Sequence, residues 1–298
     1  MTNLLKMFLR TPYHKLRNLT ERITTDNESL SQQIQRNVVT QYLLAKKHGF
    51  VLYPTLCESG FRVYSEFEED GMILYVLAMI GFKNKRVVEM CCGTGRECMA
   101  ANLIVNNGFE GYLFDGDRTN IELARAFFQS KKECLLYTPV LRHSWITTDN
   151  VNNLLIKAGC QGEVDMLSLD IDGNDYWIWQ AINAINPRLF VCEIHNMIPG
   201  DQSLTIEYQR DFDYRRHAEH EQDYRGVSLL AMVKLCKAKG YRMIGAHRHG
   251  FNVFFLRYDE GTQFFPEVSI EEVQANYWTT FSQNERWPLV KHMPWVKV

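Results

Sequence analysis

Carboxylates and small residues are spaced along the chain as they would be around a nucleotide-like ligand. Glu89 ends a short apolar run and is followed by a turn of small residues, CCGTG at 91–95. Such a turn lets backbone N–H groups approach a polar ligand closely. About twenty residues later a second apolar run ends in Asp115 and Asp117, and an acid there can accept hydrogen bonds from a ribose. The pattern predicts a nucleotide-like cofactor over the carboxyl ends of a parallel sheet.

Two later strands also end in ionisable residues. Asp170 and Asp172 follow the predicted fourth strand, and Glu193 and His195 lie at the end of the fifth. Side chains two residues apart on a strand point to the same side. Because the carboxyl ends of parallel strands meet at one edge of a sheet, these four groups are expected to converge near the reacting groups. Neighbouring carboxylates repel each other unless a cation, a proton or hydrogen bonds offset the repulsion.

The elements that must position these residues alternate along the chain. Strands are expected near residues 86–90, 111–115, 134–139, 164–170, 188–194, 241–246 and 252–257. Helices are expected near residues 26–48, 69–80, 97–107, 118–130, 149–159, 174–185, 227–239 and 269–277. This alternation predicts an α/β fold with a doubly wound, mostly parallel seven-stranded sheet. The short turn at 248–250 between the last two strands requires an antiparallel hairpin at one edge.

Three segments are expected. Residues 1–65 form an N-terminal helical extension, whose helix begins at Asp26 or Asn27 and ends at Gly49. Residues 66–260 form the α/β domain, and residues 261–298 pack back onto it. The N-terminal helices are a candidate contact for a homo-oligomer. The charged segment 214–225 is expected to be a solvated loop, with a lid over the site as the alternative.

Composition narrows the class of protein. The net charge is −2, so no bulk attraction to nucleic acid or to an anionic membrane is expected. The eight cysteines form no C-x-x-C pair, which argues against a zinc site and favours a reducing cytoplasm. The opening MTNLLKMFLRTPYHKLRNL is too short and too charged to span a bilayer. It is expected to pack on its own domain or a partner, with contact at the inner face of a membrane as the alternative.

The turn after the first strand carries a family resemblance. An acid followed by a small-residue turn ending in G-x-G resembles motif I of the class I S-adenosylmethionine-dependent methyltransferases, although Cys91 stands where that family usually has its first glycine. In that family the acid and the turn hold the methionine end of the cofactor, and the acid of the second strand binds the ribose. The resemblance implies S-adenosyl-L-methionine as cofactor, bound by Glu89, Cys91, Gly93, Thr94, Gly95, Asp115, Asp117 and Asp170.

The fourth strand resembles one branch of that family more closely. LDIDGNDYWIW at 169–179 is similar to the strand-four motif of the FkbM-like methyltransferases. The similarity runs from about residue 66 to 257 and includes AANLI at 100–104, FDGD at 114–117 and WIT at 145–147. It implies a Rossmann-like methyltransferase that O-methylates a hydroxyl of a sugar, a glycan precursor in polysaccharide biosynthesis, or a small natural product. EIHN at 193–196 departs from the E-Y-N expected there.

Two routes for removing the acceptor proton stay open. The reference pKa of histidine, about 6.5, suits His195 as a general base near neutral pH. Alternatively, Asp170, Asp172 and Glu193 hold a divalent cation, favouring Mg²⁺ because all three ligands are oxygens, which acidifies and orients the hydroxyl. The plainer alternatives are that the two aspartates cap the following helix and that His195 is a hydrogen-bonded scaffold residue.

Two other functions compete with methyl transfer. A nicotinamide-dependent oxidoreductase would need a third small residue in its glycine fingerprint, where this chain has Cys98, and would not use Glu89. A non-catalytic binding or assembly protein would retain the fold and use the helix near 26–48 to bind its partner.

Overall fold

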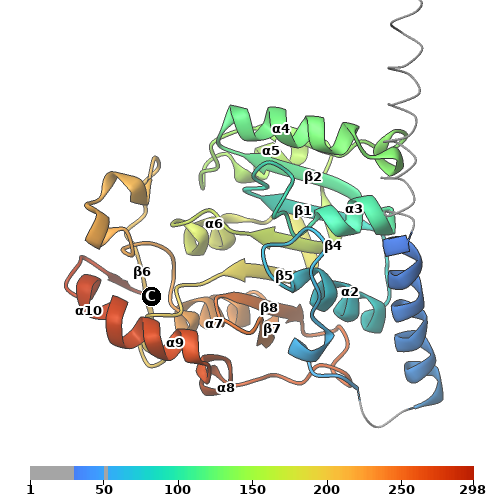
Figure 1. Cartoon of the computed structure of the whole chain (residues 1–298). Helices are drawn as coiled ribbons and strands as arrows, with labels where there is room; N and C mark the ends of the chain where they lie inside the picture. Colours follow the sequence, from blue (N-terminus) through green and yellow to red (C-terminus); the bar gives the residue numbers. More distant parts are fainter. Residues whose placement is uncertain (1–29, 50–52) are drawn as a thin grey trace, which may run out of the picture.

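Seven strands form one sheet at the centre of the protein (Figure 1). The computed structural model describes residues 30–49 and 53–298. The strands lie in the order β3-β2-β1-β4-β5-β8-β7. Their bounds are β1 Arg86–Met90, β2 Glu110–Asp115, β3 Val140–His143, β4 Gly162–Leu169, β5 Ile185–Glu193, β7 Tyr241–Ala246 and β8 Asn252–Arg257.

Strand directions confirm the predicted doubly wound, mostly parallel sheet. All pairings from β3 across to β5 are parallel. β8 runs antiparallel to both β5 and β7. The expected hairpin therefore lies at one edge, with β7 outermost and β8 between it and β5.

Helices cover both faces of this sheet. Their bounds are α2 Glu69–Ile80, α3 Ala101–Asn107, α4 Arg118–Gln129, α5 Val151–Lys157, α6 Asp175–Ala181 and α7 Leu229–Ala238. Adjacent residues of β1 show how the sheet divides the core. Val87 packs with α2, α3 and α4, whereas Val88 packs with α5, α6 and α7.

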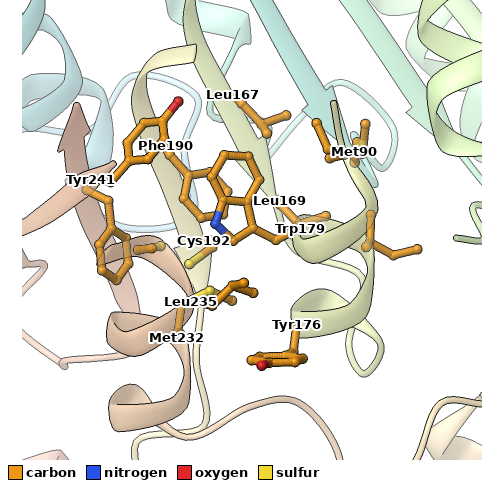
Figure 2. Packing of buried hydrophobic residues seen from close by; sticks show 14 of the residues in the cluster. Met90, Leu167, Leu169, Tyr176, Trp179, Phe190, Cys192, Met232, Leu235 and Tyr241 are labelled. Atoms are coloured by element: carbon orange, nitrogen blue, oxygen red, sulfur yellow. The ribbon is translucent and has the colours of Figure 1, made fainter. Parts of the chain in front are cut away.

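Aromatic packing fixes α6 against the sheet. Trp179 of α6 stacks on Phe190 of β5, with ring centroids 4.0 Å apart, and Tyr241 of β7 meets the same indole edge-on (Figure 2). Met232 and Leu235 of α7 close this cluster from the other side. The loops at the carboxyl ends of β4 and β5 are thus attached to a rigid core.

The strand predicted near 134–139 is wrong. The short 3₁₀ helix η2 (Lys132–Cys134) ends where that strand was predicted to begin, residues 135–139 are irregular, and β3 begins at Val140. The apolar run Leu135, Leu136 and Tyr137 that suggested a strand is exposed, by 67%, 88% and 79%. Pro139 has no N–H for a sheet ladder, so pairing starts only after it.

Several predicted helices are shorter than expected. The one near 97–107 begins only at Ala101, because Glu97 has φ +59°, outside the helical region. Those near 149–159, 174–185 and 227–239 are the shorter α5, α6 and α7. The one near 269–277 divides into α8 (Ile270–Gln274) and α9 (Tyr277–Phe281).

The N-terminal extension is helical over residues 30–48, and Gly49 follows with φ +64°. The predicted start at Asp26 or Asn27 lies outside the described residues. Gln35 and Asn102 exchange side-chain hydrogen bonds of 3.1 Å, and the rings of Tyr42 and Tyr75 lie 4.7 Å apart. These contacts attach the helix to α2 and α3 (Figure 1).

A small layer built from two distant segments, residues 197–226 and 277–298, lies beyond the carboxyl ends of the strands (Figure 1), and we call it the cap. β6 (Leu204–Thr205) pairs with β9 (Val296–Lys297). The cap has its own apolar cluster, consisting of Met197, Ile198, Leu204, Ile206, Phe212, Tyr224, Trp287 and Val290. Its short helices are η3 (Tyr214–Arg216), η4 (Glu219–Glu221), α9, η5 (Ser282–Arg286) and α10 (Trp287–Val290). In the part of the chain that is described, no helix is both long and apolar enough to cross a membrane.

Candidate cofactor and acceptor site

The turn after β1 is tied to the end of β2. The N–H groups of Cys91 and Cys92 both donate to the carbonyl of Phe114, at 2.9 and 3.0 Å. The N–H of Gly93 donates to Asp115 at 2.8 Å. Cys91 adopts φ +72°, so the chain takes the left-handed turn without a glycine at that position. The departure from the family pattern at Cys91 thus does not prevent a tight turn.

The two glycines of this turn have different surroundings. A Cβ atom at Gly95 would lie 2.9 Å from the ring of Phe127 on α4, and the backbone there has φ +78°. Gly95 is therefore required for packing within the protein itself. A Cβ atom at Gly93 would meet only the carbonyl of Arg96, at 3.9 Å. Gly93 therefore has open space beside it, in contrast to Gly95.

Glu89 binds the segment that leads into α3. Its carboxylate accepts hydrogen bonds from the N–H groups of Met99 at 3.0 Å and Ala100 at 2.6 Å, and from the thiol of Cys98 at 2.9 Å. Burial raises the pKa of Glu89 to about 7, against the opposing effect of these three bonds. Both of its oxygens are thus engaged by the protein.

The two acids after β2 have separate tasks. Asp115 is buried and accepts hydrogen bonds from the N–H of Gly93, the N–H of Asp117 at 2.8 Å and the amide of Asn120 at 3.2 Å. Asp117 caps α4 by accepting from the N–H of Thr119 at 2.6 Å, and that bond lowers the pKa of its carboxyl group. Asp115 organises the loop, whereas Asp117 organises the helix.

A pocket of about 470 Å³ opens at the carboxyl ends of the strands. Its wall consists of Cys91, Asp115, Gly116, Asp117, Arg118, Asn120, Trp145, Ile146, Ile171, Asp172, Asn174, Phe212, Asp213, Tyr214 and Arg215. Of the residues predicted to bind a cofactor, Cys91, Asp115 and Asp117 line it, and Glu89, Gly93, Thr94, Gly95 and Asp170 do not. Residues 212–215 of the cap form one side of the pocket.

Asn174 was not among the predicted site residues, although it lies inside the strand-four motif. Its side chain is 6% exposed, and its amide nitrogen donates to the carbonyl of Gln209 in the cap at 2.7 Å. That bond fixes which way the amide points. Its oxygen has no hydrogen-bond partner among the described residues. An unsatisfied buried acceptor therefore belongs to a residue of the pocket wall, and such a group is costly unless a donor is supplied to it.

Three of the four ionisable side chains expected to converge at the tips of β4 and β5 do so: Asp170, Asp172 and Glu193. We call these three residues the carboxylate cluster. One oxygen of each lies within 4.8 Å of the others. Burial, followed by the charge of Glu193, raises the pKa of Asp170 well above its usual range. Burial, followed by the charge of Asp172, raises the pKa of Glu193 to about 7. Asp170 and Glu193 share a hydrogen bond.

Arg225, from the cap, completes the carboxylate cluster and was also missed from the sequence. Its guanidinium donates to Asp172 and lies over the ring of Tyr214, 4.4 Å from the centroid. The arginine side chain is 23% exposed. Asp172 has φ +56°, which turns the chain at the tip of β4. The charged loop at 214–225 gave the only sequence signal for this contact.

His195 is a buried link between β5 and the cap. Its ring Nε2 lies 2.7 Å from the carbonyl of Asp223, so Nε2 carries the proton and donates. Burial, followed by the charge of Arg225, lowers the pKa of His195 to about 3. Burial thus makes His195 a weaker base than the ordinary histidine pKa suggests, and the bond to Asp223 fits the scaffold alternative.

No protein-family model matches this chain, and no curated protein sequence matches it either. Solved structures do. A sarcosine dimethylglycine methyltransferase from Galdieria sulphuraria matches with 12% identity and a TM-score of 0.40, over 59% of this chain and 62% of its own, less than two thirds of its length. The N-terminal domain of EvdMO1 with bound S-adenosylhomocysteine matches with 12% identity and a TM-score of 0.44, over 76% of this chain and 96% of its own.

A third solved structure is similar at the same level. An S-adenosylmethionine-dependent methyltransferase from Clostridium acetobutylicum matches with 12% identity and a TM-score of 0.38, over 60% of this chain and 86% of its own. At these TM-scores and identities the likeness carries no argument for an activity. The function therefore has to be argued from the chemistry of the pocket and the strand tips.

Proposed function

We propose that this chain is an S-adenosylmethionine-dependent methyltransferase. The observation that carries the proposal is the hydrogen bond from the turn after β1, at Gly93, to the acid that ends β2, Asp115. The bond holds the small-residue turn beside the acid to which we assign the ribose, and Cys91 of that turn and Asp115 both line the pocket. The family resemblance of both segments supports the same cofactor.

Charge in the pocket favours a cationic cofactor over a dinucleotide. Four aspartates and two arginines line the pocket. S-Adenosylmethionine carries a sulfonium and an ammonium group, whereas NAD carries two phosphates. In dinucleotide sites the first N–H groups of the helix after β1 bind the pyrophosphate. Here Glu89 already accepts from the N–H groups of Met99 and Ala100, the two residues immediately before α3, which argues against the oxidoreductase alternative.

Asn174 supports an adenosyl group as the bound moiety. Its free oxygen lies in a wall that also contains Trp145, Ile146, Ile171 and Phe212. A flat apolar wall with one fixed acceptor matches a purine that carries an exocyclic amine. We therefore assign Asn174 to that amine and Asp115 to the ribose.

We propose that Glu193, with Asp170 as its hydrogen-bond partner, removes the proton from the hydroxyl of the methyl acceptor. His195 is not assigned this role. A general base works best when its pKa lies near the operating pH. Glu193 meets that condition and receives a hydrogen bond from Asp170. His195 does not, because its low pKa makes it a weak base and its Nε2 is engaged.

A divalent cation in the carboxylate cluster is the second route, and the residues as arranged do not fit it. Carboxylate oxygens are the ligands that Mg²⁺ prefers. However, the guanidinium of Arg225 already donates to Asp172. One of the three carboxylates that would bind the metal is therefore already paired with a positive charge. No step of the reaction is assigned to a metal.

The proposed acceptor is a hydroxyl of a sugar, a glycan precursor or a small natural product. This assignment rests on the FkbM-like resemblance around 169–179, with the carboxylate cluster as proton acceptor in support. None of the eight cysteines, all of which lie in the described part of the chain, is in a disulfide, which favours a reducing compartment such as the cytoplasm. Peripheral membrane contact and self-association through the N-terminal helices stay predictions.

Calorimetry separates the candidate functions. S-Adenosylmethionine and S-adenosylhomocysteine should bind at one site per chain, and NAD should not bind. Release of S-adenosylhomocysteine on adding hydroxylated acceptors would then establish an enzyme. Tight cofactor binding without turnover on any acceptor would favour the non-catalytic alternative. Binding of NAD alone would overturn the proposal.

A further inference from the structure

Arg225 is bonded to one of the three carboxylates that a metal ion in the carboxylate cluster would need as ligands. The three carboxylates bring one oxygen each within 4.8 Å of the others, and all three residues are partly buried. The guanidinium of Arg225 enters this group through its bond to Asp172. A planar, permanently charged group therefore offsets the repulsion that three close carboxylates create.

Contacts of both its backbone and its side chain hold Arg225 beside Asp172. Its N–H donates to the carbonyl of Asp223 at 3.0 Å, and the same carbonyl accepts from His195. The carboxylate of Asp223 receives two bonds from Arg286, at 2.9 and 2.5 Å. The ring of Tyr214 supports the guanidinium from one side. Arg225 is thus fixed by both segments of the cap and by the tip of β5.

We propose that Arg225 is the built-in counter-ion of the carboxylate cluster and excludes a divalent cation from it. A divalent cation in the cluster needs a ligand from Asp172, whose carboxylate already accepts from the guanidinium, and the two positive charges would repel each other. Arginine and metal are alternative partners of Asp172. A residue of the cap, Arg225, thus neutralises the carboxylates at the tips of β4 and β5. Removing its side chain should leave a site for a divalent cation.

The test uses the full chain, without cofactor, and Mn²⁺ as the probe. Arg225→Met is compared with the parent protein by calorimetric titration, after circular dichroism has established that both are folded. The parent should show no saturable binding at concentrations up to about 1 mM, where weak oxygen sites fill. Arg225→Met should bind one equivalent of Mn²⁺, with an affinity roughly 10- to 100-fold above the upper limit that the titration sets for the parent. Adding Asp172→Asn to that variant should remove the binding.

A matched control comes from the same loop. Arg216→Met removes an equal charge, but Arg216 pairs with the exposed Asp211 at 2.9 Å, away from the cluster. It should titrate like the parent. Arg225→Gln, which keeps a polar side chain of similar length, replaces Arg225→Met if that variant does not fold.

Two results would overturn the proposal. The first is a parent protein that binds Mn²⁺ as tightly as the Arg225 variants. The second is a folded Arg225 variant that binds none. Because neither measurement involves S-adenosylmethionine, the proposal and the proposed methyltransferase function fail or succeed independently.

Discussion

The N–H of Gly93 and the carboxylate of Asp115 are joined by a hydrogen bond of 2.8 Å, although 22 residues separate them in the chain. The bond makes the turn after β1 and the end of β2 a single unit. A ligand that touches one of them is positioned by the other. Substitutions on either side should therefore report on the same ligand.

Asp115→Ala should weaken S-adenosylhomocysteine binding by about 1–3 kcal/mol, the cost of losing hydrogen bonds to a charged acceptor. It should also lower Tm, because the N–H groups of Gly93 and Asp117 lose their acceptor. Asp117→Ala should lower Tm through the lost helix cap and change affinity less. Calorimetry and thermal unfolding of both variants check this. A larger affinity loss at Asp117 would mean that the ribose acceptor is misassigned.

The two glycines of the turn should respond differently. The sequence alone predicts that Gly95→Val abolishes cofactor binding and leaves the fold intact. The contact with Phe127 now predicts a lower Tm as well, so Gly95 does not isolate the ligand effect. Gly93→Ala has free space and should fold, with a backbone cost of about 1 kcal/mol, yet lose affinity for S-adenosylhomocysteine. Unchanged affinity in Gly93→Ala would place the cofactor elsewhere.

Stability should depend on pH through Glu89. Its pKa in the folded protein is about 7, above the ordinary value of 4.5. The folded state thus keeps a proton that the unfolded chain loses. The contribution of Glu89 is fully present below pH 4.5 and is lost as the pH rises to about 7, by up to about 3 kcal/mol.

Urea unfolding across that range should show a flatter dependence of the unfolding free energy on pH in Glu89→Gln than in the parent. Glu122→Gln is the control, because that side chain is an exposed partner of Arg118 on α4. Equal slopes in the parent and Glu89→Gln would contradict the raised pKa.

Glu193→Gln should lower turnover by about 10²- to 10⁴-fold, the usual contribution of a positioned base, and should spare cofactor affinity. Asp170→Asn and Asp172→Asn should also lower turnover. His195→Gln should have the smaller effect, since its Nε2 serves the cap. The measurement is S-adenosylhomocysteine release on an accepted substrate, beside calorimetric affinities. If all four variants match the parent, the reaction occurs elsewhere, and the loop 214–225 is the next candidate.

Asn174 should set the preference for an amino purine. The parent should bind S-adenosylhomocysteine about 10- to 100-fold more tightly than S-inosylhomocysteine, in which a carbonyl replaces the amine and would face the Asn174 oxygen. Asn174→Ala should lose this preference, while Asn174→Asp, which retains an acceptor, should keep it. A preference that survives in Asn174→Ala would remove Asn174 from the assignment.

Local patterns predicted most of the sheet. The strands at 86–90, 241–246 and 252–257 have the observed bounds, because apolar β-branched and aromatic runs between turn residues are decided locally. The strand at 134–139 failed, because Leu135, Leu136 and Tyr137 look like core residues in sequence and are exposed in the fold. Burial is a property of the tertiary structure, so the apolar sequence alone could not show that these residues do not form a strand.

The candidate site divides in the same way. The sequence by itself determined the order of the elements and the acids at the strand ends, because parallel strands bring their carboxyl ends to one edge. Only the tertiary structure decided what those residues can do. Arg225 reaches Asp172 from a loop 53 residues further along the chain, and burial beneath the cap lowers the pKa of His195. The pKa of a side chain and its charge partner depend on residues that are distant in the chain and on the exclusion of water. The local sequence does not determine which residues these are or which groups are buried.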